Sequence, residues 1–248
     1  DTLRPVTGGV PIAQGSAPEG VNFNLKDHQG NIVPLQTSIL GRWKDNSIRW
    51  LLLDFQSTPP KNGKLDYVLS WSATTDSPLI RTSRNIAEKP IFSYGEITIS
   101  SVQEALLSVS KRFLIDLSLI DGEGQVFKTS VESTSIETEG DLRSTLSIVG
   151  SFQTHLGNRS FQFRLRTSIF SGLSKIRLEP IILIDSEEGV LQRIQELKLT
   201  INPLANIQSF RLGGSPEWKG TPSTNMRLFQ FDDQNYTMEG TEGKGEKA

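Results

Sequence analysis

Two arginines on one predicted β-strand are the best anion-binding candidates in this sequence. Residues 161–169 alternate apolar and polar side chains with the period of a half-buried antiparallel strand, so Arg164 and Arg166 share its polar face. A guanidinium group recognises a carboxylate through two parallel hydrogen bonds, which makes this face a candidate for substrate binding. The alternative is cross-strand ion pairing on the sheet surface with one of three acidic residues: Glu132, Glu137 or Glu179.

Tryptophan side chains offer a second kind of contact, because a flat aromatic ring stacks on the face of a sugar ring. Trp50 and Trp71 lie within apolar runs, which predicts that both belong to the core. Trp43 lies at the edge of a polar turn and Trp218 in a Gly- and Pro-rich loop, so these two are the exposed candidates for substrate binding. The alternative role for Trp43 and Trp218 is a contact between domains.

No catalytic constellation accompanies these residues in the sequence. His28 and His155 both stand in polar segments, where a solvated turn residue is the expected role, and two histidines so placed do not predict a zinc site. Residues 232–235 offer oxygen ligands but lack the spacing of a calcium-binding loop. We therefore predict no metal and no cofactor, and no catalytic residue is assigned.

Composition limits the class of protein. The chain has 248 residues, a net charge of −2 and no cysteine, which excludes a disulfide framework and indicates no basic surface for nucleic acid. No apolar run approaches the roughly 20 residues of a membrane helix. We therefore expect neither nucleic acid nor a membrane as a partner. The chain starts at Asp1 without a signal-peptide pattern, and we interpret it as a mature product or an excised fragment.

Many short alternating segments separated by turn residues predict an all-β fold, with a small N-terminal β-barrel followed by an antiparallel β-sandwich. Residues 72–90 are rich in Ser, Thr, Asn and Pro and indicate a linker. We therefore predict the barrel at residues 1–75 and the sandwich at residues 88–235. The end of the chain is rich in Gly and charge, so residues 236–248 are predicted to be a disordered tail or the lead-in to a missing domain.

Turn chemistry predicts how neighbouring strands connect. Residues 37–40 and 48–55 form a predicted hairpin closed by a polar turn, because Asp and Asn side chains bond to nearby backbone and tolerate positive φ. Residues 59–63 predict a second hairpin, between 48–55 and 64–71.

Two later segments bear on the sandwich. Pro180 indicates an edge strand or a bulge at residues 176–185, because proline cannot donate to a strand ladder. Residues 187–199 have features of both helix and strand, and we prefer a strand that starts near Ile194.

A longer pattern runs through the N-terminal third of the chain. Residues 33–55 have the sequence Val-Pro-Leu-Gln-Thr-Ser-Ile-Leu-Gly-Arg-Trp-Lys-Asp-Asn-Ser-Ile-Arg-Trp-Leu-Leu-Leu-Asp-Phe, and residues 8–12 have the sequence Gly-Gly-Val-Pro-Ile. Both resemble the N-terminal β domain of the exo-rhamnogalacturonan lyase-like family. Residues 158–166 and 170–179 resemble strands of the family's second domain, and residues 228–233 resemble the segment that leads into its third.

The resemblance implies a three-part bacterial enzyme with a small barrel, a β-sandwich and a C-terminal α/α toroid, which releases unsaturated sugars from acidic pectic polysaccharide by β-elimination. It implies that this chain corresponds to the first two domains and is inactive alone, since the catalytic machinery is expected mainly in or against the toroid. The expected partners are an acidic polysaccharide and the C-terminal toroid of the same parent chain, and a secreted or periplasmic location is favoured. An apolar patch is expected where the toroid docks. The alternative is a stand-alone carbohydrate-binding or structural β module.

Overall fold

The computed structural model describes residues 3–60, 63–72, 92–94, 97–100, 105–185, 193–204, 206–212, 218–221, 226–230, 236–240 and 243–247. Every regular element among them is a β-strand, which confirms the all-β prediction. The described residues contain no helix that could span a membrane. The predicted domain limits at residues 75, 88 and 235 and most of the predicted linker fall outside the described residues.

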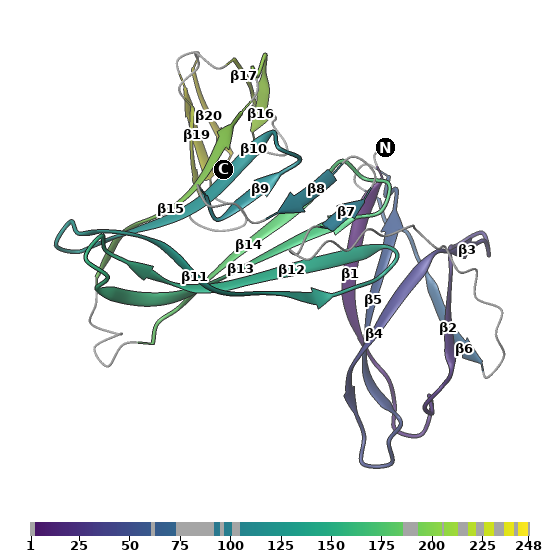
Figure 1. The fold of residues 1–248 in the computed structure, drawn as a ribbon. Helices are drawn as coiled ribbons and strands as arrows, with labels where there is room; N and C mark the ends of the chain where they lie inside the picture. The colour runs from purple at the N-terminus through teal and green to yellow at the C-terminus, as the bar shows by residue number, and fades with distance from the viewer. Residues whose placement is uncertain are drawn as a thin grey trace.

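Six strands build the N-terminal barrel (Figure 1). One sheet has the order β1-β5-β4, with β1 at Arg4–Pro11, β5 at Ile48–Ser57 and β4 at Leu35–Arg42. The other has the order β3-β2-β6, with β3 at Ile32–Val33, β2 at Asn22–Lys26 and β6 at Val68–Ser72. Side chains of both sheets pack around one buried core: Ile12, Ala17, Ile48, Leu51 and Leu53.

The strand pairing of the barrel confirms one predicted hairpin and contradicts the other. β4 and β5 pair antiparallel, as the polar turn between them predicts. β5 is hydrogen-bonded to β1 on one edge and to β4 on the other, so it has no edge left for β6. β6 pairs with β2 instead, and the hairpin predicted at residues 59–63 is therefore wrong.

The second unit is a sandwich made from one folded sheet (Figure 1). Its first layer has the order β14-β13-β12-β11, with bounds Ile176–Leu183, Arg159–Phe170, Arg143–Gln153 and Val126–Thr138. Its second layer has the order β15-β10-β9-β8-β7, with bounds Ile194–Pro203, Phe113–Asp121, Leu107–Val109, Ile97–Ser100 and Phe92–Tyr94. The layers join at the β10–β11 hairpin, and buried side chains from both form one core, which includes Leu107, Leu117, Leu146, Phe152 and Phe163.

Two strands of the sandwich bear out sequence predictions. β14 ends the strand order of its layer and contains Pro180, as expected for an edge strand. β15 begins at Ile194, and it pairs with β10 along almost its whole length.

The end of the chain contains a further small sheet. The structure places Tyr236–Gly240 in β19 and Gly243–Lys247 in β20, and these strands form a small sheet with β18 at Met226–Gln230. Main-chain pairing needs no apolar side chains, so polarity alone did not reveal these strands. A further pair joins β16, at Phe210–Leu212, to β17, at Trp218–Gly220.

A buried ion pair connects the barrel to the sandwich. Asp54 lies on β5 and Arg143 on β12, and the side chains are only 4% and 5% exposed. The Arg143 Nε and Nη2 atoms donate to the two carboxylate oxygens of Asp54 at 2.7 and 3.0 Å. Thr7 Oγ1 donates to Asp54 Oδ1 at 2.6 Å, and Arg143 Nη1 donates to Thr145 Oγ1 at 2.9 Å. Each charge is therefore paired and hydrogen-bonded, which offsets the cost of removing it from water.

Two glutamines extend this junction with bonds to the sandwich backbone. The Gln36 Oε1 atom accepts from the backbone N–H groups of Leu142 and Arg143, each at 2.9 Å, and its Nε2 atom donates to the Arg143 carbonyl at 3.1 Å. A Cβ at Gly140 would lie 2.1 Å from the Gln36 Cδ atom, so glycine is what admits this side chain. Gln56 Nε2 donates to the Ser171 carbonyl at 2.6 Å.

The junction predicts a large difference between two arginine substitutions on the same sheet. We expect Arg143→Ala to lower the free energy of unfolding by about 3–5 kcal/mol, because it leaves Asp54 buried without its partner. Arg166→Ala removes an exposed ion pair of the same layer, and we expect a loss below about 1 kcal/mol. Urea unfolding followed by tryptophan fluorescence measures both variants. Equal losses would show that the junction is worth no more than a surface pair.

Candidate functional site

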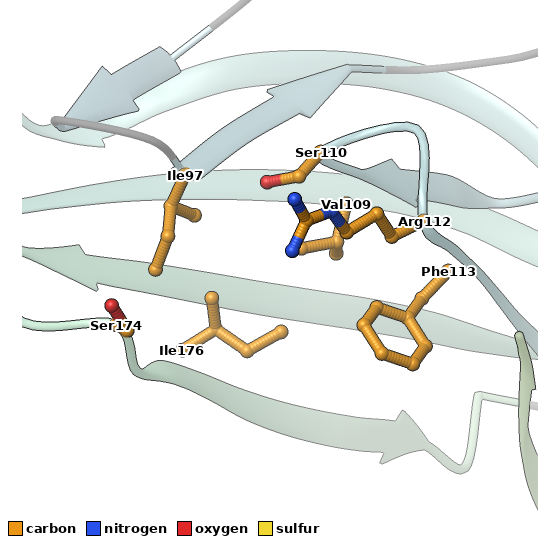
Figure 2. Close-up of a pocket in the computed structure, with 7 residues that line it drawn as sticks. All are labelled: Ile97, Val109, Ser110, Arg112, Phe113, Ser174 and Ile176. Atoms are coloured by element: carbon orange, nitrogen blue, oxygen red, sulfur yellow. The ribbon is translucent and has the colours of Figure 1, made fainter. Parts of the chain in front are cut away.

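A pocket opens at one end of the sandwich, where the β9–β10 turn approaches the start of β14 (Figure 2). It has a volume of about 450 Å³, which is within the range of small-molecule sites. The described residues that line it are mostly apolar, and their polar side-chain groups are one guanidinium and two hydroxyls. The lining residues are Ile97, Val109, Ser110, Arg112, Phe113, Ser174 and Ile176.

The turn that carries the pocket's arginine has an unusual backbone. Ser110 and Lys111 both have positive φ, at 50° and 53°, and the Arg112 N–H donates to the Val109 carbonyl at 2.9 Å. A hairpin turn with two successive positive-φ residues favours Gly or Asn, and non-glycine residues in this region cost about 1–3 kcal/mol each. Two bonds to Thr98 of β8 hold the turn: Ser110 N–H donates to the Thr98 carbonyl at 2.6 Å, and Thr98 N–H donates to Ser110 Oγ at 3.1 Å.

Arg112 supplies the only charged group that lines the pocket within the described part of the chain. Figure 2 shows its guanidinium extending from the turn over the space bounded by Ile97, Ile176 and Phe113. No hydrogen bond or ion pair of this guanidinium occurs with a described residue. An unpaired cation beside apolar walls suits an anion that also has an apolar face. This site could not be predicted from the sequence, because the Ser-Lys turn lacks the usual Asn-Gly pattern.

The predicted pair Arg164 and Arg166 lies on the outer face of β13, away from this pocket. Arg166 forms a two-pronged ion pair with Glu137, whose Oε2 accepts from Nε at 2.8 Å, and lies 3.7 Å from Glu179. The hydrogen bond to Glu137 is the main cause that raises the pKa of Arg166; burial opposes it, and the charges of Glu137 and Glu179 add to the rise. The structure therefore contains the cross-strand pairing that was the alternative. Arg164 is exposed between Val149 and Ile181 in the strand register.

The predicted tryptophan contacts have different outcomes. Trp43 is half-buried: its Nε1 atom donates to the Ile12 carbonyl at 3.0 Å, and the Arg49 guanidinium lies 4.8 Å from its ring centroid. It therefore packs within the barrel. Trp218 is in β17, but its side chain is outside the described residues. Trp71 packs against the barrel core while half-buried, close to the predicted role.

Trp50 corrects a prediction, because it is 41% exposed and does not belong to the core. Leu51 and Leu53 of β5 face the core, so strand alternation turns Trp50 to the opposite face. A Cβ at Gly9 or Gly41 would lie 3.9 Å from atoms of its ring, so each neighbouring strand has a glycine beside it. The result is an accessible aromatic ring that the sequence did not predict.

The remaining candidate positions show no catalytic arrangement. His28 and His155 are exposed turn residues of different domains, as expected, and His155 borders a second hollow of about 360 Å³ with Lys128 and Gln153. No group of three or more potential metal-ligating side chains occurs among the described residues. Residues 232–235 lie outside them.

The turn between β4 and β5 is built as predicted from Asp and Asn. Asp45 Oδ1 accepts from Ser47 Oγ at 2.6 Å and from Ser47 N–H at 3.1 Å, while Asn46 has a φ of 66°. Ser47 Oγ in turn accepts from the Gly15 N–H at 3.0 Å. The hydrogen bond from Ser47 is the main cause that lowers the pKa of Asp45.

Comparisons with known proteins identify the first domain. Residues 1–66 match the PcRGLX-like N-terminal RIFT barrel domain. This confirms the resemblance of the N-terminal region to the exo-rhamnogalacturonan lyase-like family. No curated protein matches the chain significantly.

Two solved structures share the fold of nearly the whole chain. An alpha-mannosidase from Enterococcus faecalis V583 has a TM-score of 0.53 and 11% identity, covering 96% of this chain and 35% of its own. A protein in the glycosyl hydrolase family 38 from Enterococcus faecalis has a TM-score of 0.52 and 11% identity, covering 96% of this chain and 36% of its own. The likeness concerns the fold alone, and this chain spans about a third of the length of both proteins.

The β4–β5 turn leads to a prediction on pH. Because its folded pKa is lowered, Asp45 stabilises the turn above the ordinary carboxyl range, and this stabilisation is lost as pH falls through the folded pKa. We expect Ser47→Ala to move the Asp45 pKa back towards its ordinary value, as followed by carbon NMR of the carboxyl groups. Asp27, whose pKa is lowered mainly by Asn31, is the internal control and should not move. An unchanged Asp45 titration in Ser47→Ala would contradict the assigned cause.

Proposed function

We propose that this chain is the non-catalytic N-terminal region of a polysaccharide lyase-like protein of the rhamnogalacturonan or pectin type. In this proposal, the parent protein acts by β-elimination, and the barrel and sandwich brace its catalytic toroid. The observation that carries the proposal is the match of residues 1–66 to a domain described as N-terminal in PcRGLX-like proteins. The length of the two similar solved structures supports it, since a region of this fold forms only 35% and 36% of those chains.

The chemistry of the described residues is consistent with a non-catalytic role. β-Elimination on a uronate needs a cation that neutralises the carboxylate and a base that removes the adjacent proton. Arg166 is already paired with Glu137, and the two histidines lie in turns of different domains. Among the described residues, the groups are thus not assembled for this reaction.

An apolar stripe on β15 supplies a surface on which the toroid can dock. Leu197, Leu199 and Ile201 alternate along this strand and are 42%, 38% and 52% exposed. Their partners across the strand pair are buried core residues of β10: Leu119, Leu117 and Ile115. The stripe therefore continues the core face of the sandwich but stays partly exposed, and covering it would release about 25 cal/mol for each Å² of apolar surface.

An exposed ring favours a second candidate function, a stand-alone carbohydrate-binding module. Trp50 presents an accessible aromatic surface between two glycine-bearing strands, which suits stacking on a sugar. This alternative needs no toroid, so the native size of the protein discriminates between the two.

Activity and native mass test the leading proposal together. We expect the isolated chain to release no ultraviolet-absorbing unsaturated ends from rhamnogalacturonan. An antibody raised against it should detect a protein well above 27.5 kDa in the source cells. Release of unsaturated ends by the isolated chain would contradict its non-catalytic role. A native mass near 27.5 kDa would favour the stand-alone module.

The docking surface gives a prediction on the parent protein. We expect Leu199→Lys to change the unfolding free energy of the 248-residue chain by less than about 1 kcal/mol, because the position is already partly exposed. In the parent protein, the same change should loosen the toroid, which limited proteolysis would detect as faster cleavage between the domains. Lys198→Ala lies on the opposite face of β15 and is the matched control. Equal rates of proteolysis for the two variants would rule out the stripe as the docking surface.

A further inference from the structure

The pocket at the end of the sandwich has features that bracing does not require. It combines apolar walls, a strained turn and a guanidinium that pairs with no described residue, and its lining residues include none of the β15 stripe or of the Asp54–Arg143 junction. We propose that this pocket binds a uronic acid residue, with Arg112 pairing to the sugar carboxylate. The site would hold acidic polysaccharide without performing chemistry on it, so the inference rests on the proposed function for its ligand class.

The backbone that carries the cation is fixed in place before any ligand arrives. Arg112 follows the two positive-φ residues Ser110 and Lys111, so the turn determines where its side chain leaves the backbone. The two hydrogen bonds between Ser110 and Thr98 tie the turn to β8, and the Leu204 N–H donates to the Arg112 carbonyl at 2.7 Å. A site that is rigid in the free protein loses less conformational entropy when a ligand binds. The strained turn thus determines the position from which the Arg112 side chain enters the pocket.

The walls of the pocket fit one face of a pyranose ring. Phe113 and Ile176 are half-buried and lie opposite the guanidinium, while Ile97 closes the far side (Figure 2). The axial C–H groups of a sugar form an apolar face that packs on such side chains, and aromatic rings are the usual partners. The exposed hydroxyl of Ser174 can bond to a ring hydroxyl.

The guanidinium and the apolar walls together favour a uronate over simpler ligands. A neutral sugar would leave the guanidinium unpaired, and acetate would leave the apolar walls uncovered. A planar carboxylate matches the two parallel N–H groups of arginine. A uronate supplies both the carboxylate and the ring, at a size that a pocket of about 450 Å³ accommodates.

The test uses trigalacturonate as the probe, with binding to the full 248-residue chain measured by calorimetry and by amide NMR shifts. We expect shifts at residues of the β9–β10 turn and at Ser174 and Ile176. Arg112→Ala should weaken binding about tenfold or more, because it removes a charge-assisted pair. Arg164→Ala is the matched control, since it removes an exposed arginine from another surface of the same domain and should leave binding unchanged. The methyl-esterified trimer should bind as weakly as trigalacturonate binds to Arg112→Ala.

Three outcomes would overturn the inference: no binding of trigalacturonate to the unmodified chain, equal binding to Arg112→Ala, or a loss confined to Arg164→Ala. Thermal unfolding of each variant shows whether a loss of binding reflects a loss of fold, and Arg112→Lys, which keeps the charge but not the fork of donors, should recover binding only in part. None of these outcomes bears on the native mass or the docking of a toroid. A failure here therefore leaves the bracing role standing, and a failure of the bracing role leaves this site standing.

Discussion

The ion pair between Asp54 and Arg143 determines how the two halves of this molecule are placed. Each group sits at the end of its own domain, and neither domain could bury its charge alone without a severe desolvation cost. Pairing removes most of that cost only when the geometry is good and the remaining donors and acceptors are satisfied. Thr7 and Thr145 meet this condition from the two sides. The pair therefore favours one arrangement of the domains over others more than it adds to overall stability.

The strand registers show what this arrangement does to the surfaces around the junction. Asp54 is on the same outer face of β5 as Trp50, two alternating positions away, and Arg143 is on the same outer face of β12 as the row that contains Arg166. The exposed Trp50 ring and the predicted arginines therefore lie on two sheet faces, and each of these faces also carries one residue of the Asp54–Arg143 ion pair. A loose linker would leave the relation between those faces variable. The buried ion pair and the three hydrogen bonds that Gln36 makes with the sandwich backbone hold the two faces in one relative orientation.

Period-two patterning predicted much of the fold and little of the candidate site. It identified β13 from the alternation of Phe161, Phe163 and Leu165, which the structure buries. It misplaced Trp50 because both faces of β5 are apolar, and alternation alone does not show which face meets the core. It misplaced the hairpin at residues 59–63 because local turn signals carry no information on edges already occupied by distant strands.

The junction and the pocket depend on long-range contacts, so sequence patterns indicate them only in part. Asp54 ends an apolar run, which in retrospect indicates a buried charge that needs a partner, but its partner is 89 residues away. Strand alternation places the polar side chain of Gln36 on an outer face. Its hydrogen-bond partners lie beside Gly140 in the other domain, so the sequence does not indicate them. Arg112 follows a turn whose residues are unusual for its geometry, and a contact with β8 stabilises that geometry.

The topology of the sandwich explains why its last long strand remains uncovered. β10 bonds to β15 along one edge and divides its other edge between β9 and β11. β11 continues into the opposite layer, so the two layers enclose the core on the side of β10 that pairs with β9 and β11. β15 pairs with the other edge of β10. Leu197, Leu199 and Ile201 therefore keep the orientation of core residues without a layer to face them. No local rearrangement of β15 can bury this stripe while its pairing with β10 is kept, since a shift by one residue would turn Lys198 and Thr200 inward. Among the described residues of the sandwich, the stripe therefore stays a partly exposed apolar surface, which is a consequence of the strand order and not of a local irregularity.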